Sequence, residues 1–257
     1  MKKPTFNVAI EPIAECSVMI TLDLDGETRS LTKSQQNLID PIAIDAPIFI
    51  ASIAQRIRQA FTPYLMNVTP AYNTILVDYL PYRLQESEFI SRLEQLISDI
   101  DISSLSSDQS NAILTIPTYY SKETALDLSR FEQQGISLDQ LVELHTNSIY
   151  QVSAVGFMPG FAFLSDVAPE LSMPRHETPR LSVPKGSVGI ADRKTAVYPD
   201  QSPGGWNIIG RSPLQLFNSK VSVEHLNEAS FFNVGDQVKF EAISRQDFLD
   251  LGGCLND

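Results

Sequence analysis

Residues 153–213 constrain the fold of this chain most, because glycine and proline interrupt them at short intervals. More than half of the chain's 12 glycines lie here. These interrupting residues are Gly156, Gly160, Gly186, Gly189, Gly204, Gly205 and Gly210, with Pro159, Pro169, Pro174, Pro179, Pro184, Pro199, Pro203 and Pro213. Many short strands joined by rigid, tight turns are typical of a closed or nearly closed β-barrel. The pattern therefore predicts a mainly β domain and neither a helical bundle nor a doubly wound parallel sheet.

The first hundred residues show a different periodicity. Two strand-like segments open the chain, and the second alternates apolar residues at Val18, Ile20 and Leu22. Two helical stripes follow, in which apolar residues recur at every third or fourth position. The stripes are Ile50, Ile53, Ala54, Ile57 and Phe61, then Phe89, Leu93, Leu96, Ile97 and Ile100. This part is predicted to be a compact α+β unit with helices covering a sheet.

A segment rich in serine and aspartate separates the two patterns. Residues 98–111 contain too few apolar side chains to pack strongly and are interpreted as a linker. The predicted domains are therefore a small α+β domain at 1–104 and a mainly β domain at 111–257. A capping-box pattern, with Ser137 followed three residues later by Gln140, predicts a helix that ends near His145.

Charge and composition limit the partners of the chain. A formal net charge of −12 repels nucleic-acid phosphates and anionic lipids, so we expect no nucleic-acid or membrane partner. No stretch reaches the roughly 20 apolar residues that a membrane span requires. The N-terminus does not resemble a signal peptide, and a cytoplasmic location is expected. Cys16 and Cys254 have no metal-type spacing, so no metal site is predicted.

Several motifs of self-contained enzymes are missing from the sequence. It has no phosphate loop, no dinucleotide-binding Gly-x-Gly-x-x-Gly and no Gly-x-Ser-x-Gly elbow. His176 and Glu177 lack the second histidine of a helical zinc site, and the neighbours of His176 resemble solvent-facing loop residues. The sequence therefore does not predict an independent kinase, dehydrogenase or serine hydrolase.

The glycine- and proline-rich region carries a dense set of motifs in a fixed order. They are 156–161 (GFMPGF), Pro174-Arg175, Pro179-Arg180, 183–189 (VPKGSVG), 202–206 (SPGGW) and Gly210-Arg211. Over residues 141–240 they resemble the family that comprises allophanate hydrolase subunit 1, KipI and the B subunit of 5-oxoprolinase. Residues 120–123 (YSKE) keep the tyrosine and glutamate of the family's Tyr-Gly-Gly-Glu turn and lack both glycines.

This resemblance implies a fold and a function. It implies a cyclophilin-like barrel at 111–257 and a role as the B subunit of an ATP-dependent 5-oxoprolinase, which opens 5-oxo-L-proline to L-glutamate. Its expected partners are the KipA-like C subunit and the A subunit of that enzyme. ATP is expected to be bound by the complex, at a site not located in this chain. The chain alone is expected to be inactive. Two alternatives stay open: a KipI-like inhibitor of a sensor histidine kinase, and a component of urea or allophanate metabolism.

Arginines in loops are the first candidate substrate-binding residues. Arg175, Arg180 and Arg211 each stand beside proline, histidine or glycine in the motifs, and a guanidinium is a planar fork that suits a carboxylate such as that of 5-oxoproline. The alternative is that they pair with local acidic residues.

The other candidates are glycines, a proline, a serine and aromatic residues of the same motifs. The predicted substrate-binding set is completed by Phe157, Pro159, Gly160, Phe161, Gly186, Ser187, Tyr198, Gly204, Gly205 and Trp206. Glycines allow a ligand to approach the backbone, prolines fix the loops, and the aromatic residues are expected to line a pocket or a seam between subunits, or else to pack in the core. The hypothesis is that these residues gather at one mouth of the barrel.

Two residues are candidates for catalysis. His145 is a candidate general acid or base, because histidine titrates near neutral pH; the alternative is that it caps its helix or packs in the fold. Glu123 is a candidate acid, and its alternative is a solvated residue at a helix start.

Overall fold

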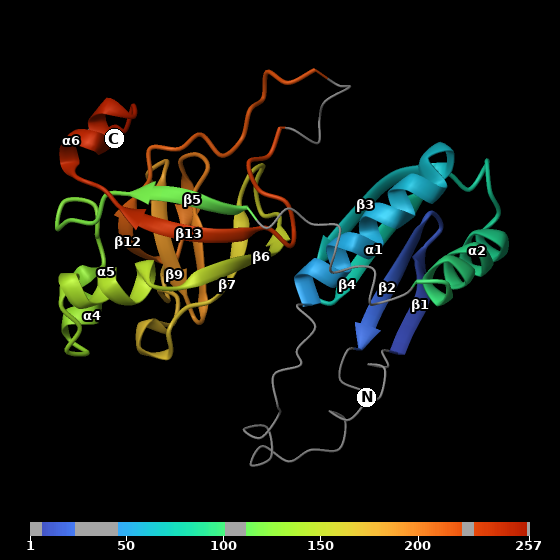
Figure 1. The fold of residues 1–257 in the computed structure, drawn as a ribbon, viewed down its shortest axis with the longest axis horizontal. Helices are drawn as coiled ribbons and strands as arrows, with labels where there is room; N and C mark the ends of the chain where they lie inside the picture. The colour runs from blue at the N-terminus through green and yellow to red at the C-terminus, as the bar shows by residue number, and fades with distance from the viewer. Residues whose placement is uncertain (1–6, 24–45, 101–111, 223–228, 256–257) are drawn as a thin grey trace, which may run out of the picture. The chain divides into compact units, whose positions relative to one another are not determined.

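The computed structural model describes residues 7–23, 46–100, 112–222 and 229–255 (Figure 1). The chain divides into two compact units, Met1–Ser110 and Asn111–Asp257. The division falls within the predicted linker, of which residues 101–111 lie outside the described part.

The N-terminal unit is an antiparallel sheet with helices packed against it. The strand order is β1 (Asn7–Ala14), β2 (Ser17–Asp23), β4 (Thr74–Tyr79) and β3 (Leu65–Ala71). The helices are α1 (Ala46–Phe61), the short η2 (Thr62–Tyr64) and α2 (Glu86–Ser98). Figure 1 shows these helices beside the sheet. Both predicted helical stripes pack in one core with alternate residues of β2 and β4, Leu96 being partly buried. The predicted α+β pattern is confirmed here.

The C-terminal unit is dominated by short antiparallel strands. They are β5 (Ile113–Thr118), β6 (Ile149–Val155), β7 (Ala162–Asp166), β8 (Arg180–Val183), β9 (Ser187–Ala191), β10 (Lys194–Val197), β11 (Ser202–Gly204), β12 (Asn207–Arg211) and β13 (Gln237–Ala242). The path runs β5-β13-β6-β7-β10-β9-β12, and only β5 and β13 pair in parallel among the described strands. Tyr119, just after β5, pairs with Arg211 in β12, so the two ends of the path meet. β8 and β11 form a separate two-stranded sheet.

Short helices flank this sheet. They are α4 (Leu128–Glu132), α5 (Leu138–Thr146), η3 (Pro169–Leu171) and α6 (Arg245–Asp250). The predicted capping box at α5 is present: the Ser137 side chain accepts from the Gln140 backbone N–H, and the Gln140 side chain accepts from the Ser137 N–H. None of the described helices has the length and apolar character needed to cross a bilayer.

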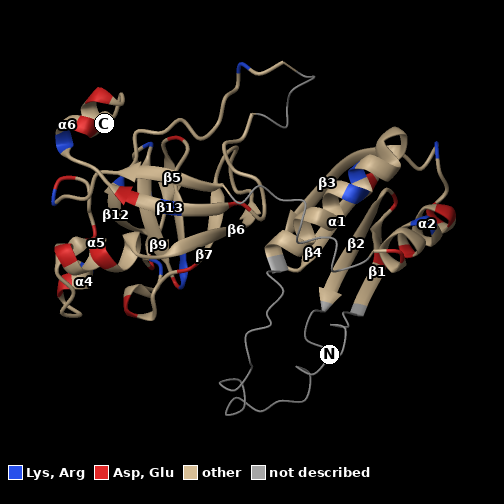
Figure 2. Cartoon of the chain, in the orientation of Figure 1, with Lys and Arg blue, Asp and Glu red and all other residues tan. Residues whose placement is uncertain are grey.

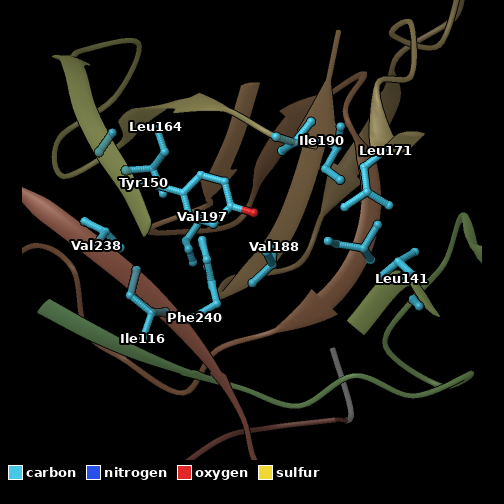
Figure 3. Close-up of a cluster of buried hydrophobic side chains, with 14 of the residues drawn as sticks. Ile116, Leu141, Tyr150, Leu164, Leu171, Val188, Ile190, Val197, Val238 and Phe240 are labelled. Atoms are coloured by element: carbon cyan, nitrogen blue, oxygen red, sulfur yellow. The ribbon is translucent and has the colours of Figure 1, made fainter. Parts of the chain in front are cut away.

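Two apolar clusters use opposite faces of the same strands. Successive side chains of a strand point to opposite faces. Val197 and Ile209 therefore enter the larger cluster, drawn in Figure 3, whereas Ala196 and Ile208 enter a smaller one. The larger cluster gathers side chains from β5, β6, β9 and β13 between α5 and the sheet. The smaller cluster contains most of the aromatic residues that the sequence motifs supply.

Candidate functional site

The smaller cluster, here called the Trp206 cluster, brings together aromatic residues from distant motifs. It consists of Phe161, Val183, Ala191, Ala196, Tyr198, Trp206 and Ile208, with Met158 and Phe163 packed against it. The Phe161 ring lies at its centre, with edge-to-face ring centroid distances of 5.2 Å to Phe157, 5.4 Å to Tyr198 and 5.5 Å to Trp206. The predicted aromatic residues therefore share one place in the fold.

Phe157 faces solvent although it is aromatic and conformationally strained. Its side chain is 68% exposed and its φ is +72°, a left-handed conformation that is an outlier for a bulky residue. The turn is closed by a hydrogen bond from the Gly156 N–H to the Phe161 carbonyl oxygen, and Pro159 and Gly160 complete it. Strain of this kind is typical of functional sites, so an exposed, strained Phe157 favours a contact surface.

The Arg175 guanidinium lies over the Trp206 ring, 5.7 Å from its centroid. Within the described part of the chain, Arg175 pairs with no carboxylate. Arg180 instead forms an ion pair with Asp127 at 2.5 Å and approaches the Trp206 carbonyl oxygen at 3.5 Å. The two neighbouring arginines therefore differ in what they are able to bind.

Tyr198 places a buried hydroxyl beside the two arginines. Burial raises the pKa of Tyr198 to about 12, although the backbone at Trp206 and the charges of Arg175 and Arg180 oppose this effect. Gly204 is packed against this hydroxyl: a Cβ at this position would lie 2.3 Å from the tyrosine oxygen. Gly204 is therefore a glycine because the tyrosine approaches its backbone closely. The neighbouring Gly205 accepts a hydrogen bond from the His176 N–H through its carbonyl oxygen.

Asp127 bonds to several parts of this region, a role that was not predicted from the sequence. Its Oδ1 accepts from His176 Nε2 at 2.8 Å and from Arg180 at 2.5 Å. Its Oδ2 accepts from the Ile208 N–H at 2.6 Å. The sequence neighbours of His176 are exposed, as expected, but its own side chain is only 25% exposed and is bonded to the buried Asp127. No sequence motif marks Asp127, which precedes α4 and has the position of an ordinary N-cap.

Arg211, Gly186 and Ser187 form a second group of predicted residues that lie together. Arg211 is buried, and its Nε donates to the Lys185 carbonyl oxygen at 2.8 Å. Gly186 has φ +78°, and a Cβ there would lie 2.2 Å from the Ser212 carbonyl oxygen, so only glycine fits. The buried Ser187 accepts a backbone hydrogen bond from Tyr198. The backbone of this group therefore supports β10 and β12 beside the Trp206 cluster.

His145 lies in the core and not at an exposed helix end. Its ring is wholly buried, with Nδ1 2.7 Å from the Tyr120 hydroxyl and Nε2 2.9 Å from the Thr195 hydroxyl. Burial lowers the pKa of His145 to about 3, so the ring is neutral at pH 7. Thr195 passes the chain of hydrogen bonds on to the Gly189 carbonyl oxygen. These contacts connect the His145 ring to Tyr120 and, through Thr195, to β10.

Glu123 lies on the surface against the C-terminal helix. Its carboxylate accepts from the Tyr119 hydroxyl at 2.8 Å and from Arg245 Nε at 3.1 Å. The Tyr119 ring also packs on Phe248 of α6. The candidate residues thus fall into separate groups: the Trp206 cluster with Arg175 and Arg180, the group around Arg211, the buried His145, and Glu123 beside α6. Their roles in binding and catalysis stay predictions.

Comparisons with known proteins identify the family. The model of the carboxyltransferase domain, subdomain C and D, matches residues 28–226. The 5-oxoprolinase B subunit of Bacillus subtilis is 32% identical over 214 residues, which cover 77% of this chain and 84% of the relative. That of Haemophilus influenzae is 35% identical over 178 residues, which cover 68% and 75% of the two chains.

Solved structures show the same fold. The crystal structure of TTHA0988 superposes with a TM-score of 0.65 at 30% identity over 78% of this chain, and this chain covers only 37% of that longer one. The urea carboxylase of Kluyveromyces lactis superposes with a TM-score of 0.61 over 97% of this chain and 23% of its own, at 12% identity, which is a likeness of fold alone. This mixed α/β chain therefore belongs to the carboxyltransferase subdomain C and D family, together with the proteins named as the B subunit of 5-oxoprolinase.

Proposed function

We propose that this chain is the B subunit of an ATP-dependent 5-oxoprolinase that opens 5-oxo-L-proline to L-glutamate, and that Arg175 binds the substrate carboxylate. One structural observation carries the proposal: a guanidinium with no carboxylate partner among the described residues lies over the Trp206 ring, beside further aromatic side chains. The names of the family relatives supply the substrate class.

Charge supports the choice of Arg175. The chain has a net charge of −12, and acidic residues are prominent along α4 and α5 in Figure 2. On such an acidic protein, an exposed arginine without a carboxylate partner among the described residues is a candidate to bind a small anion. A guanidinium binds a carboxylate through two parallel N–H···O bonds, while its flat face stays on the aromatic ring. Arg180 is already paired with Asp127, which leaves Arg175 to take the ligand.

The neighbouring aromatic residues suit the rest of such a substrate. A five-membered lactam presents apolar ring carbons next to its carboxylate and amide. The Arg175 guanidinium lies over the largely buried Trp206 ring, and Phe157, which contacts Phe161 of the same cluster, exposes an apolar face. Ligand sites typically combine apolar walls with a few well-placed polar groups. The proposed subsite has this composition.

The chemical step needs activation of a poor electrophile. An unstrained amide resists attack by water. Transfer of a phosphoryl group from ATP to the lactam oxygen, with release of ADP, activates the carbonyl carbon. Water adds to this carbon, the ring C–N bond breaks to free the amine, and hydrolysis of the resulting acyl phosphate releases phosphate and glutamate. The proposal places ATP on the complex with a KipA-like C subunit and an A subunit, and assigns it no residue of this chain. It also routes no proton through His145, because the ring is buried and both of its nitrogens are engaged.

The proposal includes the architecture and location that the resemblance implies. Residues 111–257 form a cyclophilin-like barrel joined to a domain at 1–104, in a cytoplasmic hetero-oligomer. The meeting of the sheet ends at Tyr119 and Arg211 supports the barrel.

Reconstitution tests the function. The chain is purified alone and together with the A and C subunits encoded in the same genome, and glutamate released from 5-oxo-L-proline and ATP is measured. We expect turnover only from the assembled complex. Glutamate release by the chain alone, or an assembled complex that leaves oxoproline intact, would contradict the proposal.

A further inference from the structure

We propose that Asp127 is a positioning residue that fixes Arg175 over the Trp206 ring. The inference rests on the proposed role of Arg175 in binding a carboxylate. It adds a residue that does not itself touch the substrate and determines where the binding group stands.

Asp127 is built into the edge of β12. Its N–H donates to the Ile208 carbonyl oxygen at 3.0 Å, and its Oδ2 accepts from the Ile208 N–H at 2.6 Å. The side chain makes no capping bond to α4, although the residue stands at the N-cap. Asp127 therefore forms with Ile208 the pair of hydrogen bonds that a residue of a neighbouring strand would form. Ile208 lies two residues after Trp206.

The other carboxylate oxygen holds the loop that carries Arg175. Oδ1 of Asp127 accepts from His176 Nε2 and from Arg180, which begins β8. The His176 N–H in addition donates to the Gly205 carbonyl oxygen at 2.8 Å. The buried Asp127 carboxylate thus links His176, the residue after Arg175, to β12, the strand that follows Trp206. It links Arg180, at the end of the loop, to the same strand.

The start of the same loop is tied independently. The Asn207 amide donates to the Pro174 carbonyl oxygen at 3.1 Å, and Arg130 donates to the same oxygen at 3.3 Å. Asn207 also donates to the Ile190 carbonyl oxygen at 2.9 Å, which fixes it to β9. Arg175 therefore stands between two anchored residues, Pro174 and His176, and its side chain extends from this fixed backbone over the indole.

The charge of Asp127 matters as well as its shape. It is buried, and Arg180 and His176 are its basic partners within the described residues. The ion pair with Asp127 makes the Arg180 guanidinium unavailable to ligands in solution. The Arg175 guanidinium remains available to bind a carboxylate. Without the carboxylate, both the loop geometry and the distinction between the two arginines are lost.

The test uses the single tryptophan of the chain. Its emission reports on the Trp206 ring alone, with no ligand and no partner protein present. Arg175→Gln removes the cation from the ring and is expected to change the emission. Asp127→Asn, which keeps the size and an oxygen acceptor for the Ile208 N–H, is expected to produce the same change. In the Arg175→Gln background, Asp127→Asn should change nothing further, because it acts through the arginine.

A matched control separates this effect from a general loss of charge. Asp166 also pairs with basic residues, Arg193 and Lys194, at the β7–β10 pair. Asp166→Asn is expected to leave the emission unaltered. His176→Ala removes only one tie of Asp127 and serves as the milder second variant if Asp127→Asn does not fold. We expect it to cause a smaller change in the same direction, again absent in the Arg175→Gln background.

Wild-type emission from Asp127→Asn, or an effect fully additive with that of Arg175→Gln, would overturn the inference. In the reconstituted complex, Asp127→Asn is expected to raise the KM for oxoproline about tenfold with kcat retained. An equal fall in kcat without a rise in KM would also count against positioning. If the wild-type complex does not turn over oxoproline, the proposed function fails, and the emission cycle still decides the role of Asp127.

Discussion

The guanidinium of Arg175 lies 5.7 Å from the centre of the Trp206 ring, whereas Arg180, five residues further along, pairs with the buried Asp127. Both arginines directly follow a proline in the same motif region. Their environments nevertheless differ, and we expect the two side chains to have different roles. One guanidinium is stacked and open to a ligand, and the other holds the structure together.

This difference predicts opposite phenotypes for the two arginines. Arg175→Gln is expected to raise the KM of the assembled complex for oxoproline by about tenfold or more, because a charge-assisted bond to the carboxylate is lost. Its free energy of unfolding should change by less than about 0.5 kcal/mol, as for other surface substitutions. Enzyme kinetics and urea unfolding measure the two effects.

Arg180→Gln should instead lower the free energy of unfolding by about 2 to 3 kcal/mol, since it leaves the buried Asp127 carboxylate without its strongest partner. Arg193→Gln is the control, because its ion pair with Asp166 is exposed and is expected to contribute less than about 1 kcal/mol. Equal stability losses for Arg180→Gln and Arg193→Gln would contradict the assignment.

The buried His145 predicts a specific dependence of stability on pH. Its folded pKa of about 3 lies below the ordinary value of 6.5, so the unfolded chain binds a proton that the folded chain does not. Stability from this residue is therefore complete above about pH 6.5 and is lost as the pH falls toward 3. At about pH 5 the loss should reach about 2 kcal/mol.

Urea unfolding of the wild type and of His145→Gln at about pH 8 and about pH 5 measures this effect. The two proteins share every other titrating group, so the difference between them isolates the imidazole. The stability advantage of the wild type should shrink by about 2 kcal/mol on acidification. Parallel pH profiles would show that the ring is not held neutral in the fold.

Periodicity predicted the parts of the fold whose causes are local. The α1 stripe and the alternation in β2 were visible because a helix repeats every 3.6 residues and a strand every two. The capping box of Ser137 and Gln140 was equally visible, because its partners lie three residues apart. Motif resemblance likewise identified Phe161 and Trp206, which the fold brings into contact.

Long-range partners explain what the sequence could not predict. The carboxylate of Asp127 bonds to residues 49, 53 and 81 positions away, so nothing around it in the sequence marks its role. His145 was placed correctly near the end of its helix, but its ring turns inward because Thr195 lies 50 residues further on. The choice between a paired and a free arginine depends on such distant acids.

Phe157 predicts a separation of stability from function. Its side chain is exposed and its backbone strained, so Phe157→Gly loses little burial and relieves the positive φ. We expect a change in the free energy of unfolding of no more than about 1 kcal/mol, together with weaker oxoproline binding by the complex. Phe161→Ala, at the buried centre of the cluster, should cost about 3 to 4 kcal/mol. A large loss of stability from Phe157→Gly would assign that ring to the core.

Gly204 provides a test of close packing against the Tyr198 hydroxyl. Gly204→Ala places a Cβ 2.3 Å from this oxygen and 2.9 Å from the ring carbon that bears it. The substitution should destabilise the protein by about 1 to 3 kcal/mol, as overpacking does. Gly156→Ala is the control, because a Cβ there meets no atom within 4 Å and the φ is not positive. It should change stability by less than about 0.5 kcal/mol.

Adding Tyr198→Phe to Gly204→Ala removes the closest of the contacts and should restore part of the lost stability, in a double-mutant cycle measured by urea unfolding. Strict additivity of the two substitutions would show that the hydroxyl does not press against this backbone.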